Sequence, residues 1–551
     1  MTLKLSGASL LKRRTEMRPE MEVKTKSGIV SGKYENNIYS FKGIPYAEAP
    51  VGINRWLPTK PVQAWKGIKD CSDYGPISPQ NEVIYDNDAT SEILREDSNQ
   101  SEDCLTLNIW TPEMKENKKP VMVWIHGGAW WMGSGNEELL NPDNICRNNG
   151  FVVVSFNYRL ACFGFLRLVD ITEGMIPSTG CEALLDQIEA LKWIKKNITL
   201  FGGDENNISV IGQSAGGHSI STLISMPEAK GLFHKAIICD GGAETYQPKE
   251  ESNRLALKLL EEYDILPNEI EKIYSLTTDQ LKAFDAKLQD PNSDFSGLNK
   301  DFATQAHAKP CIDGEHIPLE PLEAIRRGSA KDIDVILGTS DDEAFGYDEL
   351  YQGLREFDIE QAVDEEYKDW ERKSDYLDIT EDPTKEQIRF LLLTYQKHLK
   401  DKGLDSSIAE SFLKLNGHKF FWVSTVRLAE VLSLHNEKVF NYVWTFPGPH
   451  GSPYHGSGLP MYFGWHKTPR GKAMVGEGPE VDKVAEFTFN AWSNFMKHGN
   501  PLLSMPDKKW PTYGKERNSL IINTNFRVVQ DFNSTLRKAW DKVELRIPGN
   551  L

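Results

Sequence analysis

The 551-residue sequence lacks the features that mark several classes of protein. No apolar run approaches the roughly 18 residues that a membrane-spanning helix requires, so no membrane span is expected. An excess of basic residues is also absent, because 80 acidic residues outnumber 63 basic ones and give a formal net charge of -17. Such a chain repels phosphate backbones, which excludes nucleic acid as an expected partner.

Cysteine is sparse and offers no pairing pattern. The seven cysteines are odd in number and scattered, and no two of them form a CxxC pair. Neither a zinc site nor a disulfide framework is therefore predicted, and we expect no metal. Buried free thiols in a reducing compartment are the expected state, which favours a cytoplasmic location.

Linkers rich in Pro, Ser and Gly are missing, and so are internal repeats, which predicts one large domain over residues 23–551. Residues 1–22 carry basic residues without a sustained apolar stretch. This composition predicts a disordered leader and argues against a secretory signal. The sequence leaves the oligomeric state open, with a monomer among the possibilities.

The pattern of apolar residues predicts an α/β protein. Short antiparallel strands are expected over residues 23–124, and helical insertions over about 250–300 and 355–435. Between them, strands alternate with helices, which is typical of a large, mostly parallel central sheet flanked by helices. The expected buried strands are 121–125, 151–156, 207–212, 234–240, 332–340 and 438–446, the last being the final buried strand, and the expected helices include 182–198 and 215–226.

The segment "SVIGQSAGGHS" contains the pattern G-x-S-x-G between a predicted strand and a predicted helix. In such a turn the backbone before and after the serine comes close together, so glycine is needed at Gly212 and Gly216. The following helix then directs its free N–H groups at the serine, which favours negative charge beside Ser214. A plain turn is the alternative, but the context favours a catalytic nucleophile.

A second glycine-rich turn, "WIHGGAWWMGSG", follows the buried strand 121–125. Small residues allow backbone N–H groups to approach a reacting oxygen closely, as an oxyanion hole requires. We expect the donors to be Gly128, Ala129 and Ala215, with Gly127 shaping the turn. Trp130 and Trp131 indicate an apolar, aromatic substrate pocket, although either or both could simply belong to the core.

Together these segments resemble the type-B carboxylesterase/cholinesterase family, and within it the bacterial para-nitrobenzyl esterases. The resemblance also rests on "FKGIPYAEAPVG", "SEDCLTLNIW", "NYRLACFGFL", "GLFHKAI" and "FTFNAWSNFMKHGNP", and it extends from about residue 28 to about residue 510. It implies the α/β-hydrolase fold, a serine carboxylesterase and no metal or organic cofactor.

A serine nucleophile needs a histidine base, and the histidine needs a carboxylate. By position alone Asp341, Asp342 and Glu343 all qualify, and so do His450 and His455. The resemblance selects Glu343, which precedes a small residue in "DEA". It also selects His455, which lies four residues before Leu459-Pro460 and nine before Gly464.

The resemblance implies hydrolysis of small to medium uncharged carboxylic esters, with Gln213 lying beside the substrate. Relatives often carry glutamate where this chain has Gln213, and cholinesterases carry a choline-stacking tryptophan that the segment 71–104 lacks, so a choline ester is not expected. Alternative activities for the same triad are carbamate, amide or lactone hydrolysis. A catalytically silent interaction protein is the remote alternative.

Two structural ion pairs also follow from the resemblance, namely Arg55 with Glu102 and Arg159 with Asp186. Secreted relatives bridge Cys104 to a cysteine that is replaced here by Ser78. This substitution again favours an intracellular location.

Overall fold

The computed structural model describes residues 21–81, 99–114, 118–137, 142–289, 308–346, 353–374, 383–502 and 509–543. The strands are β1 Glu22–Lys24, β2 Ile29–Ser31, β3 Lys33–Glu35, β4 Ile38–Pro45, β5 Ile68–Asp70, β6 Thr106–Thr111, β7 Lys119–Ile125, β8 Val152–Phe156, β9 Gly203–Gln213, β10 Lys235–Cys239, β11 Asp334–Ser340, β12 Val439–Trp444, β13 Asn518–Ile522 and β14 Arg527–Gln530.

Helices connect and cover these strands. The α-helices are α1 Pro142–Asn149, α2 Ala161–Phe165, α3 Glu182–Asn197, α4 Ala215–Leu223, α5 Lys249–Glu262, α6 Ile270–Ser275, α7 Thr278–Gln289, α8 Pro321–Arg326, α9 Ile359–Ser374, α10 Lys385–Asp401, α11 Ile408–Gly417, α12 Ser424–Leu432, α13 Leu459–Tyr462, α14 Pro469–Val475, α15 Pro479–His498 and α16 Ser534–Lys542. Short 3-10 helices span Gly52–Asn54, Ile198–Phe201, Pro227–Ala229 and Leu354–Glu356, and a π-helix spans His418–Val423.

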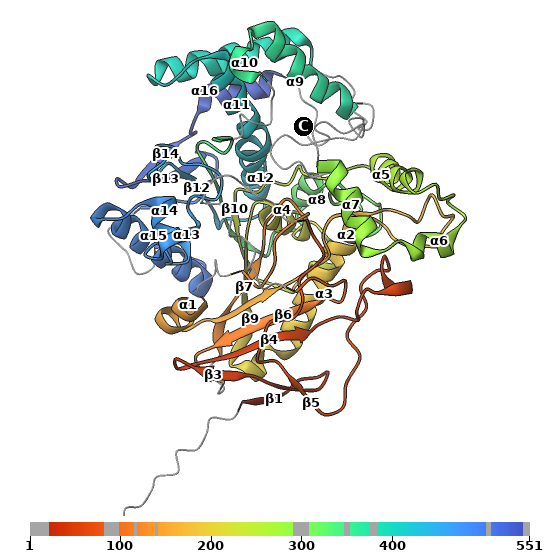
Figure 1. Cartoon of the computed structure of the whole chain (residues 1–551). Helices are drawn as coiled ribbons and strands as arrows, with labels where there is room; N and C mark the ends of the chain where they lie inside the picture. Colours follow the sequence, from red (N-terminus) through yellow and green to blue (C-terminus); the bar gives the residue numbers. More distant parts are fainter. Residues whose placement is uncertain are drawn as a thin grey trace, which may run out of the picture.

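An 11-stranded sheet runs through the molecule in the order β14-β13-β12-β11-β10-β9-β7-β8-β6-β4-β3 (Figure 1). Its central strands, which are β8, β7, β9, β10, β11, β12 and β13 in spatial order, are parallel to one another. The strands β3, β4 and β6 extend one side of this parallel region in antiparallel order, and β14 does so on the other side. The predicted mostly parallel sheet is thus confirmed.

The central strands are buried on both faces because their residues are apolar at nearly every position. In β7, Val121 and Val123 face a core that includes α3, α4 and α12, whereas Met122 and Trp124 face a core that includes α1, α13 and α15. Side chains of a strand alternate between the two faces of its sheet, so a continuous apolar run supplies both cores.

The two predicted helical insertions are present among the described residues. Helices α5, α6 and α7 pack with α2 in a core of their own, and α9 to α11 pack with α16 in another. In Figure 1 the first group lies at the right of the sheet and the second lies above it. Residues 290–307, at the end of the first predicted insertion, fall outside the described residues.

Three expectations need correction. Residues 438–446 do not hold the final buried strand, because β13 is mostly buried and pairs in parallel with β12. The first described strand also begins before position 23, since β1 starts at Glu22, inside the predicted leader. Residues 1–20 of that leader lie outside the described residues. The N-terminal region is not purely antiparallel, because β2 pairs with β5 in parallel in a separate three-stranded sheet.

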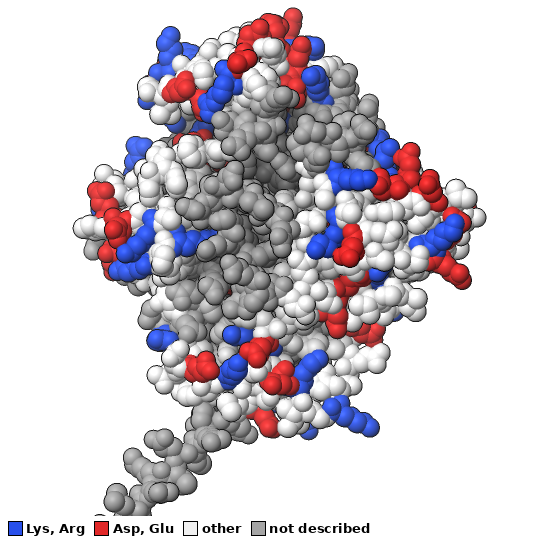
Figure 2. Space-filling view, in the orientation of Figure 1, with Lys and Arg blue, Asp and Glu red and all other residues white. Residues whose placement is uncertain are grey.

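Charged side chains of both signs are interspersed on the face of the molecule drawn in Figure 2. All seven cysteines fall in the described part of the chain and are buried free thiols. Within that same part, no helix combines the length and the apolar character needed to cross a membrane.

Candidate active site

The candidate catalytic residues follow neighbouring parallel strands at the points where those strands end. β7 ends at Ile125 before the glycine-rich loop, β9 at Gln213 before Ser214, and β11 at Ser340 before Glu343. β12 ends at Trp444, and the loop that follows it carries His455. Carboxyl ends of parallel strands meet at one edge of a sheet, which is where α/β proteins bind ligands.

Ser214 occupies a strained turn between β9 and α4. Its φ of 56° and ψ of -127° lie outside the regions that residues with a side chain ordinarily adopt. A Cβ atom at Gly216 would lie 2.1 Å from the carbonyl oxygen of Ile125, and one at Gly212 would lie 2.6 Å from the backbone of Gly216. The two glycines of the G-x-S-x-G pattern are therefore required by close backbone approach, as predicted.

The loop after β7 lies against this turn. A Cβ atom at Gly127 would meet the carbonyl oxygen of Gln213 at 2.7 Å and Cβ of Ser214 at 3.2 Å. Gly128 and Ala129 have positive φ values of 96° and 52°. Among the described residues, no recorded backbone hydrogen bond uses the N–H of Gly128, Ala129 or Ala215. Ala215 is the first residue of α4, where helix geometry leaves the N–H without a partner in the helix.

The two tryptophans beside this loop differ in their surroundings. Trp130 is fully buried, and its indole N–H donates a hydrogen bond of 2.9 Å to the Ser219 hydroxyl. Its ring packs with those of Phe165 and His218, so in this structure Trp130 belongs to the core and is not exposed to a substrate. Trp131 packs separately with Met132 and Ala161 and keeps a small exposed fraction of 8%.

Glu343 and His455 are in direct contact. Oε2 of Glu343 lies 2.5 Å from Nδ1 of His455, and Oε1 of Glu343 accepts a 2.7 Å hydrogen bond from the backbone N–H of Ser340. Because a carboxylate faces Nδ1, that nitrogen carries the proton and leaves a lone pair on Nε2. This pairing joins the two residues that the resemblance selected.

The rejected candidates lie elsewhere. Asp342 accepts a 2.5 Å hydrogen bond from the Ser452 hydroxyl, and both Asp341 and Asp342 form ion pairs with Lys414. His450 is exposed, with its ring near that of Tyr454. None of these three side chains has a recorded hydrogen bond to His455 or Glu343 within the described parts of the chain.

Gln213, the neighbour of Ser214 in the chain, contacts His455. Its Nε2 lies 3.1 Å from Nε2 of His455 and 3.1 Å from Oδ2 of Asp240. An amide NH₂ group has two donors, and it can satisfy both of these acceptors at once. No recorded hydrogen bond joins the Ser214 hydroxyl to His455 in the described structure, so the Gln213 amide occupies the position on Nε2 that a nucleophile would take.

Burial governs the protonation of this group. Desolvation lowers the pKa of His455 below its ordinary value, with the Asp240 carboxyl acting in the opposite direction. It also raises the pKa of Glu343 to about 8, against hydrogen bonds from Asp240 and the Ser340 backbone. The ring of His455 packs 4.7 Å from that of Phe421, which belongs to the π-helix His418–Val423. Neutral imidazole, the form that can act as a base, is thereby favoured.

Asp240 and Phe421 are site residues that the sequence interpretation missed. Asp240 directly follows β10, so its place at the carboxyl edge of the sheet could have identified it. Phe421 carries no such signal, because a π-helix has no simple sequence pattern. Ligand atoms of Asp240, Glu343 and His455 lie within 4.8 Å of one another, as a metal site would require. Their hydrogen bonds with one another and with Gln213 engage these atoms, and we assign no metal to them.

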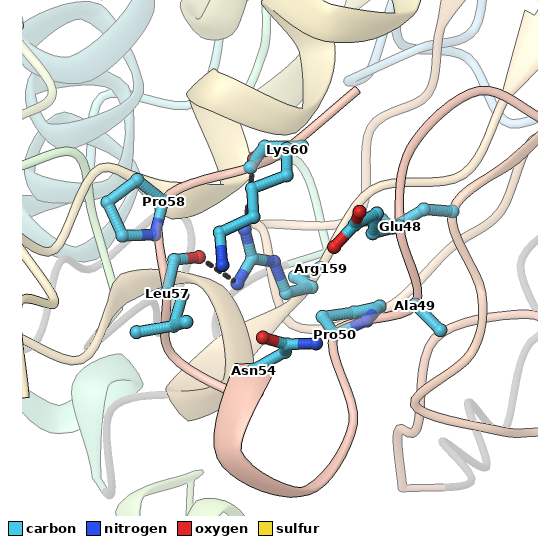
Figure 3. A pocket seen from close by; sticks show the side chains of 10 residues that line it. Glu48, Ala49, Pro50, Asn54, Leu57, Pro58, Lys60 and Arg159 are labelled. Carbon is cyan, nitrogen blue, oxygen red and sulfur yellow. Dashed lines mark hydrogen bonds between the residues drawn. The ribbon is translucent and has the colours of Figure 1, made fainter. Parts of the chain in front are cut away.

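Both predicted ion pairs are present, the first mostly buried and the second fully buried. Arg55 forms a two-pronged pair with Glu102, through contacts of 2.6 and 2.8 Å. Arg159 pairs in the same way with Asp186, with both contacts at 2.8 Å. Figure 3 shows Arg159 at a small pocket that Glu48 and Lys60 also line.

That pocket lies outside the candidate active site. Its lining contains none of the candidate catalytic residues, and Arg159 is the one lining residue that closely follows a central strand, β8. Every guanidinium nitrogen of Arg159 already donates to a protein oxygen. The acceptors are the Asp186 carboxylate, the Thr59 hydroxyl and the backbone carbonyls of Arg55, Leu57 and Glu182. The arginine therefore holds the chain together and offers no donor to a ligand.

Comparison with known proteins agrees with this geometry. The profile of the Carboxylesterase family matches residues 19–540. The para-nitrobenzyl esterase of Bacillus subtilis (strain 168) is 33% identical over 523 residues, which cover 94% of this chain and 97% of that protein. A phenmedipham hydrolase of Pseudarthrobacter oxydans is 43% identical over 216 residues, or 39% of this chain and 41% of that protein.

A solved structure with the same architecture is the carboxylesterase EST55 of Geobacillus stearothermophilus. It superimposes with a TM-score of 0.80 at 28% sequence identity, covering 95% of this chain and 100% of that chain. The match of fold and sequence extends over nearly the whole chain, including every element that carries a candidate catalytic residue. The chain therefore belongs to the carboxylesterase family, has the α/β-hydrolase fold and is a carboxylic ester hydrolase.

Proposed function

We propose that the chain hydrolyses small to medium uncharged carboxylic esters through an acyl-enzyme on Ser214. His455 is the general base and acid, and Glu343 orients it. The observation that carries this proposal is the 2.5 Å contact between Glu343 and Nδ1 of His455, beside a serine held in a strained turn. Backbone strain of this kind costs about 1–3 kcal/mol and is typical of catalytic positions.

In the acylation step, Nε2 of His455 takes the proton of the Ser214 hydroxyl as its oxygen attacks the ester carbonyl carbon. For this, the Gln213 amide must leave Nε2, since the two groups compete for the same lone pair. The imidazolium that forms is stabilised by Glu343 through Nδ1. It then gives the proton to the departing alcohol, and the carbonyl of the acyl-enzyme reforms.

The negative oxygen of the tetrahedral intermediate needs aligned donors. The N–H groups of Gly128, Ala129 and Ala215 have no recorded backbone partner in the described structure and lie on the two turns that meet at Ser214. Donors fixed in advance need no reorganisation during the reaction, and each is worth roughly 10²–10³ in rate. In deacylation, water attacks the acyl carbon with His455 again as the base, and the acid is released.

The proposed preference for uncharged esters rests on charge. The side chain next to the nucleophile is the amide of Gln213, not a carboxylate, so it provides no anion to attract a cationic substrate. Trp131, which is buried beside the oxyanion loop except for 8% of its surface, is the tryptophan that can offer apolar surface to the acyl or alcohol group. Trp130 is not assigned to the substrate pocket, because it is fully buried.

A fluorophosphonate probe tests the nucleophile. We expect peptide mass spectrometry to find the label on Ser214, and we expect Ser214→Ala and His455→Ala to prevent labelling. The matched controls are Ser221→Ala, a buried serine of α4 whose hydroxyl donates to the Gly217 carbonyl, and His450→Ala in the exposed loop. Labelling of another serine in the wild-type protein would overturn the proposal.

The acyl and alcohol preference needs a substrate panel. p-Nitrophenyl esters of increasing chain length would measure the size of the acyl pocket, and carbamates, amides, lactones and phenmedipham would test the alternative activities of the same triad. The match to a phenmedipham hydrolase is the reason to include that compound. A kcat/KM for carbamates above that for every ester would replace the ester proposal.

We further propose a cytoplasmic protein whose partners are small molecules and not nucleic acid. Seven buried free thiols and Ser78 support this location, and the net charge of -17 argues against nucleic acid. Fractionation of the source cells would test the location, and sedimentation of the purified chain would measure the oligomeric state, which the sequence leaves open. Recovery in a secreted fraction would contradict the proposed location.

A further inference from the structure

Asp240 is a buried carboxyl for which the triad has no role. It follows β10 directly, has a φ of 50° and is 2% exposed. Oδ2 accepts hydrogen bonds from Nε2 of Gln213 at 3.1 Å and from the backbone N–H of Gly456 at 3.2 Å. Through these two contacts Asp240 touches the neighbour of Ser214 and the neighbour of His455.

Asp240 also lies against Glu343. The backbone N–H of Ser340 donates to both carboxyls, at 3.2 Å to Oδ1 of Asp240 and at 2.7 Å to Oε1 of Glu343. Oxygen atoms of the two carboxyls lie within 4.8 Å of each other, and a hydrogen bond between them, for which one carboxyl must be protonated, raises the pKa of Asp240 and lowers that of Glu343. Two buried carboxyls in such contact cannot both ionise, because like charges repel strongly in a desolvated site. The pair therefore holds one proton.

The surroundings decide which carboxyl holds that proton. Glu343 has His455 and the Ser340 N–H as hydrogen-bond donors, and Lys414 is a nearby cation. Burial and the Glu343 carboxylate together raise the pKa of Asp240 to about 8, against the lowering effects of His455 and Gln213. The hydrogen bond from Asp240 in turn favours ionised Glu343. Although burial brings the pKa of each carboxyl to about 8, the hydrogen bond from Asp240 and the contact with His455 both favour an ionised Glu343, so Asp240 is the acid of the pair and Glu343 is the anion.

The other titratable groups near the pair are Asp342, which adds negative charge, and Cys239, Tyr442 and Tyr462. Burial raises the pKa of the Cys239 thiol and of both tyrosine hydroxyls, so these three stay neutral at neutral pH. No base in this group competes with Asp240 for its proton.

We propose that Asp240 is a positioning residue that keeps its proton at neutral pH and donates it in a hydrogen bond to the Glu343 carboxylate. The donation fixes Glu343 against Nδ1 of His455, while the same carboxyl fixes the Gln213 amide and the Gly456 N–H. This inference rests on the proposed role of Glu343 and His455. Loss of the Asp240 proton leaves two adjacent carboxylates, whose repulsion moves Glu343 away from His455.

Two variants separate the proton of Asp240 from its charge. Asp240→Asn keeps a donor of the same size and removes no charge if Asp240 is protonated. We expect its kcat at pH 7 within about threefold of wild type and an unchanged acid limb of the kcat/KM profile. We also expect the wild-type profile to fall as pH rises past about 8, and this alkaline step to be absent from Asp240→Asn. An acid limb that moves down by about one pH unit in Asp240→Asn would show an ionised Asp240 and overturn the proposal.

Asp240→Ala removes the donor altogether. We expect kcat to fall roughly 10- to 100-fold with KM little changed, because a positioning contact is lost and no substrate contact is. Wild-type kcat in Asp240→Ala would also overturn the proposal. Rescue by asparagine but not by alanine distinguishes hydrogen-bond donation from simple filling of space.

A readout independent of catalysis is the infrared difference spectrum of wild type minus Asp240→Asn. We expect the carbonyl band of a protonated carboxyl at pH 7, disappearing above about pH 9 as the acid ionises. Absence of the band at pH 7 would overturn the proposal, whatever the kinetics. Fluorophosphonate labelling of the same wild-type sample distinguishes the two proposals. Failure to label Ser214 would reject the proposed nucleophile but would not change the infrared result for Asp240.

Discussion

Glu343 and His455 meet at 2.5 Å between Oε2 and Nδ1, although 112 positions separate them in the chain. Each residue follows the end of a different parallel strand, and β11 and β12 are neighbours in the sheet. The carboxylate side chain is fully buried, whereas the imidazole keeps 17% of its surface exposed. His455 is therefore held at Nδ1 by Glu343, while its Nε2 faces the Gln213 amide.

Glu343→Gln should lower kcat by about 10³-fold, because an amide neither holds the required tautomer of His455 nor stabilises the imidazolium. The measurement is hydrolysis of a p-nitrophenyl ester at saturating substrate. Asp342→Asn is the matched control, since this neighbouring acid contacts Ser452 and Lys414 instead, and its kcat should stay within about threefold. Equal losses in the two variants would remove the special role of Glu343.

The acid limb of the kcat/KM profile should lie below pH 6.5, the ordinary pKa of histidine, because burial lowers the pKa of His455. Only neutral imidazole accepts the Ser214 proton, so activity should be lost as pH falls through the pKa of the folded protein. His450→Gln, in the exposed part of the same loop, should keep the same limb. A limb centred above pH 7 would contradict this assignment.

The strands and the nucleophile turn were predictable because they depend on local sequence. Continuous apolar runs determine β7, β8 and the second half of β9, and the two glycines around Ser214 follow from the close approach of backbone atoms. The choice of Glu343 over Asp341 and Asp342 was not predictable from the residues alone. It depends on which carboxylate the loop after β11 turns toward His455, a tertiary contact that only the family resemblance supplied.

Other parts of the site depend on contacts between distant segments. The hydrogen bonds of Gln213 to His455 and Asp240 link three loops, and no local pattern encodes them. Trp130 was assigned to the substrate pocket on composition, yet its indole N–H finds a partner in Ser219 and the ring enters the core. β13 was missed because its apolar run is confined to Leu520, Ile521 and Ile522, and it becomes a recognisable buried strand only through its pairing with β12.

Gly127→Ala should lower kcat by roughly 10²-fold or more with little loss of stability. The added Cβ would lie 2.7 Å from the carbonyl oxygen of Gln213, so the oxyanion loop would have to move away from Ser214. Gly231→Asn is a control for the loss of a glycine. Gly231 has a φ of +77° and open space around it, and it lies before the start of β10, at the opposite edge of the sheet from the candidate site. Full activity of Gly127→Ala would mean that the loop does not contribute to the oxyanion hole.

Arg159→Met should reduce the free energy of unfolding by about 3–5 kcal/mol, because it leaves the buried Asp186 carboxylate without its cation. Urea unfolding followed by tryptophan fluorescence measures the change. Arg327→Met is the control, since Arg327 is 64% exposed and its pair with Glu323 is screened by water, so the unfolding midpoint should not move. An equally small effect of Arg159→Met would contradict the structural role of the buried pair.

Asp285, on α7, should make the protein less stable as pH rises. It is buried against Cys162, whose thiol lies 3.2 Å from Oδ2 and whose N–H lies 3.4 Å from Oδ1, and burial raises its pKa from 3.8 to about 7. The folded state thus binds this proton more tightly than the unfolded state does. The stability it contributes is fully present below pH 3.8 and is lost as pH rises through 7.

Asp285→Asn does not titrate, so the wild-type protein should lose about 2 kcal/mol of unfolding free energy relative to this variant between pH 5 and pH 8. Urea unfolding of both proteins at the two pH values gives the change in unfolding free energy with pH for each. Subtracting the change of the variant from that of the wild type removes the contributions that the two proteins share. Asp279→Asn, which replaces an exposed acid on the same helix, is the matched control. Its unfolding free energy should differ from that of the wild type by the same amount at both pH values. Parallel behaviour of wild type and Asp285→Asn would mean that Asp285 is ionised in the folded protein despite its burial.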